Sequence, residues 1–221
     1  MLYLLLIVIS LVLGLGAQAA IRSTYSKYSR VPVSNGMTGA ESARRMLDSC
    51  GLQHVAIYQL NTDDLADHYD PTKNTLSLSR SVYSGRSVAA TAVACHEAGH
   101  AVQHAQRYMP ARIRMALVPV TQLAGNLWMI VFIMGLFLNM MGFIYLAIAL
   151  FAFALVFQLV TLPVEFDASR RGLAFIQGYP VRPQAELEGT SKVLRAAAFT
   201  YVAAALVSVV QLLYMVGLAR R

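Results

Sequence analysis

The segment from Met115 to Leu162 contains no charged residue, and this property constrains the fold more than any other feature of the chain. A single helix needs about 20 apolar residues to cross a bilayer. The segment is roughly twice that length, so it predicts two membrane-spanning helices joined by a tight turn near Leu138–Gly142. Two further apolar runs, Met1–Ala20 and Ala196–Ala219, are each long enough for one span. We therefore expect four transmembrane helices.

The segment His96-Glu97-Ala98-Gly99-His100 has the H-E-x-x-H spacing of zinc peptidases. On a helix, residues four apart lie on one face, so both imidazoles could bind a single Zn²⁺. Glu97 lies beside them and could take a proton from a zinc-bound water, whose pKa the metal lowers to about 7. The alternative interpretation is a helix that carries two unrelated histidines.

The spans divide the polar residues into two segments, 21–114 and 163–195, and a membrane hairpin should return both to the same compartment. All but two of the 18 Lys and Arg residues lie in these segments. Lys and Arg beside spans favour the cytoplasmic side, so we expect a cytoplasmic catalytic region with both termini outside. The expected order is a transmembrane helix (1–20), a catalytic domain (21–114), a transmembrane hairpin (115–162), a second part of the catalytic region (163–195) and a transmembrane helix (196–219).

The formal charge of +7 does not require a nucleic-acid partner. Basic loops beside the spans and anionic lipid headgroups of the bilayer account for it. Ala17-Gln18-Ala19 resembles a signal-peptidase site, but signal peptides carry a positive N-terminal region and Met1–Ser10 has no charge. We therefore expect a retained membrane anchor.

Local patterns predict a small α+β zincin-like domain with a short antiparallel sheet inside a mainly α membrane protein. Thr38 and Glu41 have the capping-box spacing at the start of a helix that should end at Gly51. His54–Leu60 is expected to be a strand, and the alternation in Thr75–Ser79 predicts another. The motif helix should run from about Ser87 to Tyr108. Its polar residues set it apart from intramembrane proteases, which carry the motif inside an apolar span.

A catalytic zinc usually has three protein ligands and one open position. His104 cannot join His96 at one ion, because eight helical residues rise about 12 Å. Glu165 is the better candidate, since Pro163 suits the first turn of a new helix that would carry Glu165 toward the motif. The alternative is a carboxylate that only stabilises the start of that helix. The residues by themselves leave both interpretations open.

Four segments of this sequence resemble the YugP-like family of neutral zinc metallopeptidases, which are bacterial membrane proteins. They are His96–His100, Asp67-His68-Tyr69-Asp70-Pro71, Leu76-Ser77-Leu78-Ser79 and 162–171, and the resemblance extends over nearly the whole chain, including Lys192–Ala205. It implies an HtpX-like gluzincin arrangement with Glu165 as third zinc ligand. It also suggests a role in membrane-protein quality control.

One position departs from the broader gluzincin pattern, Glu-x-x-x-Asp. Ser169 stands where the acidic residue would orient a ligating histidine, and it could accept that hydrogen bond only more weakly. Asp167 would point to the wrong side of an ideal helix. The sequence therefore leaves open which group orients the histidines.

These features predict a zinc-dependent endopeptidase that acts on membrane or membrane-adjacent proteins. The strand formed by Thr75, Leu76, Ser77, Leu78 and Ser79 is expected to pair with the peptide. His68 and Tyr69 are candidates to stabilise the oxyanion, although both could simply flank a turn. One alternative is a non-catalytic membrane scaffold whose zinc only links the polar domain to the hairpin. The presence of Glu97 argues against this alternative, because a purely structural zinc site does not need that carboxyl group. A transporter is disfavoured, because the spans after residue 114 carry no charge.

Overall fold

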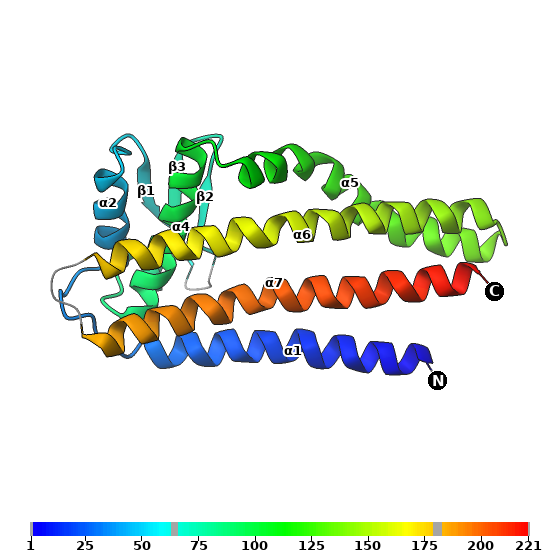
Figure 1. Ribbon diagram of the computed structural model, residues 1–221, viewed down its shortest axis with the longest axis horizontal. Helices are drawn as coiled ribbons and strands as arrows, with labels where there is room; N and C mark the ends of the chain where they lie inside the picture. Colours follow the sequence, from blue (N-terminus) through cyan, green and yellow to red (C-terminus); the bar gives the residue numbers. More distant parts are fainter. Residues whose placement is uncertain (1, 63–65, 179–182, 221) are drawn as a thin grey trace. The chain divides into compact units, whose positions relative to one another are not determined.

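The computed structural model describes residues 2–62, 66–178 and 183–220, and these are mainly helical (Figure 1). The chain divides into two compact units, the first comprising 1–18, 112–163 and 199–221 and the second comprising 19–111 and 164–198. The helices are α1 (Leu2–Tyr28), α2 (Gly39–Ser49), α3 (Arg80–Tyr83), α4 (Val88–Ala105), α5 (Met109–Phe137), α6 (Met141–Gln177) and α7 (Gln184–Ala219).

Four helices in the described part of the chain are long and apolar enough to cross a membrane, as the sequence predicts. They are α1, α5, α6 and α7. The turn between α5 and α6 covers Leu138–Met140, where Asn139 adopts a left-handed conformation with φ of 52°. Gly135 of α5 allows a close approach to α6, because a Cβ atom there would lie 2.8 Å from the Ile144 side chain. The two long apolar helices and the short turn expected for this segment are therefore present.

The prediction that a new helix begins at Pro163 is wrong. Figure 1 shows α6 as one continuous helix, and Pro163 lies inside it. A proline removes one backbone hydrogen bond from a helix, and membrane helices tolerate this loss where neighbouring groups compensate. Glu165 is therefore carried by the same helix that forms the third span.

The sheet has three strands in the order β1-β3-β2, with bounds Ala56–Gln59 for β1, His68–Asp70 for β2 and Thr75–Leu78 for β3. The β2–β3 pair is antiparallel, as predicted, with His68 opposite Ser77. The β1 strand pairs with β3 in parallel, with Ala56 opposite Thr75. The small sheet is therefore mixed rather than wholly antiparallel.

Helix α4 is packed on several sides by α2, α3, β2 and β3. It begins as the sequence predicts, with the Ser87 side chain accepting a hydrogen bond from the Ala90 amide, but it ends at Ala105, three residues before Tyr108. The capping box of Thr38 and Glu41 on α2 is also confirmed. The buried residues that α4 contributes to this core are small or medium in size, namely Ala94, Cys95, Ala98, Ala101 and Val102.

Candidate metal centre

His96 and His100 of α4 lie next to Glu165 of α6. The Nε2 atoms of the two histidines are 3.3 and 3.6 Å from the same Glu165 oxygen, Oε2. One donor atom from each of the three residues lies within 4.8 Å of the other two. The Glu165 side chain is buried, with 3% of the residue exposed, and both imidazoles are partly buried. The structure thus brings together the three residues that the sequence suggests as ligands.

Two glycines allow this approach of α4 to α6. A Cβ atom on Gly99 would lie 2.6 Å from the Ala168 carbonyl oxygen, and one on Gly172 would lie 2.9 Å from the Cys95 carbonyl oxygen. Real Cβ atoms do not make contacts below 3.0 Å without a shift of the neighbouring atoms. Glycine on each helix is therefore what lets the backbones pass close enough for the three donor atoms to meet.

The geometry of the cluster fits a zinc ion. Ligands of a tetrahedral zinc lie about 2.0–2.1 Å from the ion, which places them roughly 3.3–3.4 Å from one another. The two measured distances to Glu165, 3.3 and 3.6 Å, are close to that spacing. Two imidazole nitrogens and one carboxylate oxygen form a donor set of catalytic zinc sites, which leave a fourth position for water or substrate.

The second nitrogen of each histidine has its own hydrogen-bond partner, and these partners are candidates to orient the two rings. His96 Nδ1 lies 3.0 Å from the Ser169 hydroxyl. His100 Nδ1 lies 3.1 Å from the Oε1 atom of Gln103, a residue that our sequence reasoning missed. Its position three residues after His100 was the available signal, because side chains at that spacing are neighbours on a helix.

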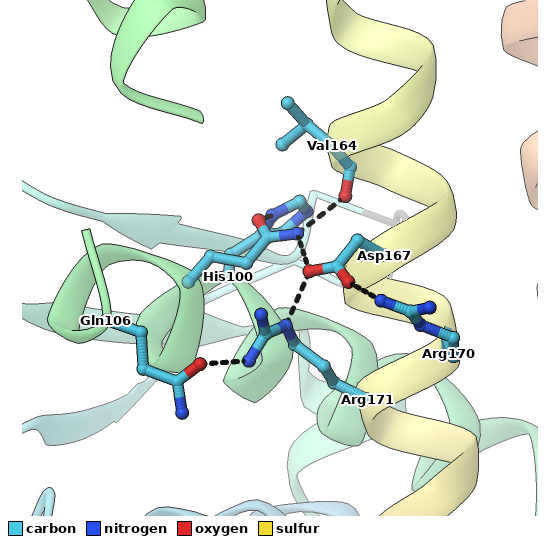
Figure 2. Close-up of polar contacts among 7 residues, drawn as sticks. His100, Gln106, Val164, Asp167, Arg170 and Arg171 are labelled. Atoms are coloured by element: carbon cyan, nitrogen blue, oxygen red, sulfur yellow. Dashed lines mark hydrogen bonds and ion pairs between the residues drawn. The ribbon is translucent and has the colours of Figure 1, made fainter. Parts of the chain in front are cut away.

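Asp167 reaches His100 through Gln103. Figure 2 shows Asp167 together with its partners Arg170 and Arg171. The Gln103 amide nitrogen donates to Asp167 at 2.9 Å and to the Val164 carbonyl oxygen at 2.8 Å. Arg170 and Arg171 donate to the two carboxylate oxygens of Asp167. This buried carboxylate therefore anchors the glutamine beside the site.

Glu97 is partly buried between the ligand positions on α4. Burial raises the pKa of its carboxyl group, and the nearby His96 and His100 oppose that rise. The negative charge of Glu165 also raises the pKa of Glu97, but by less than burial does. The site therefore combines three potential ligands with an adjacent carboxyl group that can exchange a proton.

The two oxyanion candidates, His68 and Tyr69, lie on β2. The Tyr69 hydroxyl donates to Asn74 at 2.9 Å and lies 2.9 Å from His104 Nδ1. Burial raises the pKa of Tyr69 to about 12. His68 is exposed, and its Nδ1 atom lies 2.9 Å from the Ala66 carbonyl oxygen. An oxyanion role for either residue stays a prediction.

The prediction that Thr75–Ser79 forms a substrate-pairing edge strand is wrong. The β3 strand lies in the centre of the sheet and is paired on both sides, so it has no free edge for a peptide. Ser79 lies just beyond β3, where its amide and hydroxyl donate to Asp67. The edge strands are β1 and β2, and of these β2 packs against α4.

Comparison with known proteins agrees with the resemblance noted in the sequence. Residues 3–220 match the family described as "Putative neutral zinc metallopeptidase". A Bacillus subtilis (strain 168) protein named "Putative membrane protease YugP" is 45% identical over 216 residues, which cover 98% of this chain and 96% of that protein. No solved structure matches the chain. With the histidine pair and Glu165 gathered at one point, this near-complete match shows that the chain belongs to the family of putative neutral zinc metallopeptidases.

Proposed function

We propose that this chain is a membrane-bound zinc endopeptidase of the gluzincin type, which hydrolyses peptide bonds in membrane or membrane-adjacent proteins. The observation that carries the proposal is the cluster of His96, His100 and Glu165, with Glu97 at the next position on the same helix. A single zinc ion at this cluster would polarise the scissile carbonyl and make a hydroxide available at neutral pH.

Each residue of the site then has a defined task. His96 and His100 present Nε2 toward the ligand position, because their Nδ1 atoms are engaged by Ser169 and Gln103. Glu165 supplies the negatively charged ligand. Glu97 accepts the proton of the attacking water and returns it to the leaving amine, as a general base and then a general acid.

The outer edge of β2, which pairs with no strand among the described residues, is the surface that we assign to the peptide. It belongs to the same small sheet as the strand first expected to bind substrate, and it packs against the helix that carries Glu97. A peptide added as a further strand forms main-chain hydrogen bonds, which depend little on the amino-acid sequence of the peptide. This mode of binding suits an enzyme that cleaves many different proteins, as quality control would demand.

Membrane-adjacent substrates follow from the position of Glu165 along α6. It comes three residues after the uncharged run that ends at Leu162, which corresponds to about 4.5 Å of helical rise. The basic residues on the polar segments favour the cytoplasmic side for this end of the helix. We therefore expect cleavage close to the cytoplasmic surface of the bilayer.

Glu97 separates this proposal from a non-catalytic scaffold held together by zinc, which has no use for that carboxyl group. We expect purified Glu97→Gln to bind zinc like the wild type but to cleave a panel of reconstituted membrane proteins at least about 100-fold more slowly, as for loss of a general base. Glu188→Gln serves as the control, because Glu188 is exposed on α7. Equal cleavage by the wild type and Glu97→Gln would remove Glu97 from the mechanism.

A further inference from the structure

We propose that Gln103 is a positioning residue that holds the proton of His100 on Nδ1 and so directs the lone pair of Nε2 at the metal. This inference rests on the zinc site of the proposed function and specifies how the Gln103 side chain acts on His100. Gln103 is buried, with 1% of the residue exposed, and its side chain contacts both His100 and Asp167.

The hydrogen bonds of the Gln103 amide allow only one orientation. Its nitrogen carries two protons, and the two atoms that face it are the Val164 carbonyl oxygen and an Asp167 carboxylate oxygen. Both are acceptors. If the amide were flipped, its own oxygen would face two other oxygens in a buried place and make no hydrogen bond. The oxygen Oε1 therefore faces His100.

This orientation determines where His100 carries its proton. The amide oxygen can only accept a hydrogen bond, so Nδ1 of His100 must donate across the distance of 3.1 Å. A neutral imidazole has one proton, and with that proton on Nδ1 the lone pair lies on Nε2. Nε2 is the atom of His100 that faces Glu165.

The partner of His96 does not impose the same restriction. Ser169 has a hydroxyl group, which can donate or accept. Its contact with Nδ1 orients the ring but is compatible with either position of the proton. The two histidines are therefore held differently. Gln103 fixes the tautomer of His100, whereas Ser169 leaves the tautomer of His96 open.

The anchor for Gln103 is a carboxylate held by two guanidinium groups. Arg170 and Arg171 each donate to Asp167, and Arg171 also donates to Gln106 at the end of α4. Charge-assisted hydrogen bonds are stronger than neutral ones, so this arrangement keeps the acceptor for Gln103 in place. Asp167 thus acts on a ligating histidine through an intervening amide, while the direct contact to the other histidine is made by Ser169.

Two substitutions of Gln103 test this role in the full-length protein in detergent. Gln103→Met has a similar size but offers no acceptor oxygen to His100. We expect its zinc affinity, measured by competition with a chelator, to fall about 10–100-fold, as for loss of other groups that orient metal ligands. The visible spectrum of bound Co²⁺ should change as well. Gln103→Glu keeps an acceptor oxygen, so its zinc affinity should stay closer to that of the wild type.

The same two variants distinguish a positioning role of Gln103 from a purely structural role in holding α4 and α6 together. Gln103→Glu places a second carboxyl group against Asp167 and Val164, so its metal-free form should melt at a lower temperature than that of Gln103→Met. If Gln103 only holds α4 and α6 together, the less stable variant should also bind zinc more weakly. Gln103→Glu would then have a lower zinc affinity than Gln103→Met. The opposite order supports the inference.

Gln53→Met is the matched control, because Gln53 is exposed and its amide donates to the Asp48 carbonyl oxygen on α2 rather than to a residue of the site. We expect its zinc affinity and Co²⁺ spectrum to equal those of the wild type. Equal zinc affinity of the wild type and Gln103→Met would overturn this inference and leave the proposed function intact. A wild-type chain that does not bind zinc would overturn both.

Discussion

The carbonyl oxygen of Ala168 lies 2.6 Å from the point where a Cβ atom on Gly99 would be. Gly99 immediately precedes the ligand candidate His100, and Ala168 follows Glu165 by three residues on α6. The backbone contact between these two residues therefore sets the separation of α4 and α6 at the site, and with it the distance between Glu165 and the two histidines. A side chain at position 99 would have to push α4 and α6 apart.

We therefore predict that Gly99→Ala weakens the metal site without removing a ligand. Overpacking of this kind costs about 1–3 kcal/mol of folding stability, and a shift of a few tenths of an ångström would also separate the three donor atoms. Zinc content and melting temperature should both fall. Gly125→Ala on α5 is the control, because a Cβ atom at Gly125 meets nothing within 4 Å. Unchanged zinc binding by Gly99→Ala would show that the helices do not need this approach.

Glu165→Gln should nearly abolish zinc binding. The substitution keeps the shape of the side chain but removes the charge that faces both Nε2 atoms at 3.3 and 3.6 Å. We expect the loss of affinity to exceed the roughly 10–100-fold typical of groups that only orient ligands. Metal analysis after dialysis measures it, with Glu188→Gln as the control. Full zinc occupancy in Glu165→Gln would show that the third ligand is another residue.

The parts of the fold that depend on local signals could be predicted from the sequence. The four spans follow from apolar length, and the α2 N-terminus follows from the capping box of Thr38 and Glu41. The helix start predicted at Pro163 is wrong, because a proline indicates a helix start only through its own backbone conformation. Whether the helix continues through it depends on how its surroundings compensate for one missing hydrogen bond.

Features that depend on distant parts of the chain could not be predicted. The central position of β3 results from pairing with both β1 and β2, and the alternation in its sequence does not reveal how many partners it has. The task of Gln103 depends on Val164 and Asp167, which lie on α6. For the same reason, Glu165 could be predicted as the third candidate ligand only from the family resemblance, in addition to the spacing of the histidines.

Removal of the metal should destabilise the protein reversibly. A ligand present at 100 times its dissociation constant stabilises the folded state by about 2.7 kcal/mol if it does not bind the unfolded chain. We expect a chelator to lower the melting temperature and added zinc to restore it in a concentration-dependent way. Glu97→Gln should respond like the wild type, since Glu97 is not a ligand, whereas Glu165→Gln should not respond. A melting temperature independent of zinc in the wild type would contradict binding at this cluster.

The orientation of the chain in the membrane can be tested with its own cysteines. Cys50 is exposed and Cys95 is buried, so a thiol reagent should label Cys50 selectively in the folded protein. If the polar segments face the cytoplasm, a membrane-impermeant maleimide should label Cys50 only after the cells are permeabilised. The basic residues on those segments are the physical reason for this expectation.

A variant with a cysteine in the hairpin turn gives the opposite expectation and completes this test. Leu138 follows α5 and is 55% exposed. In a Cys50→Ser background, Leu138→Cys should be labelled in intact cells, because the turn lies at the other end of the span from the polar segments. Labelling of Cys50 but not of Leu138→Cys in intact cells would place the candidate active site outside the cytoplasm. The substrates would then be extracytoplasmic segments of membrane proteins, while the zinc site and its chemistry would be unaffected.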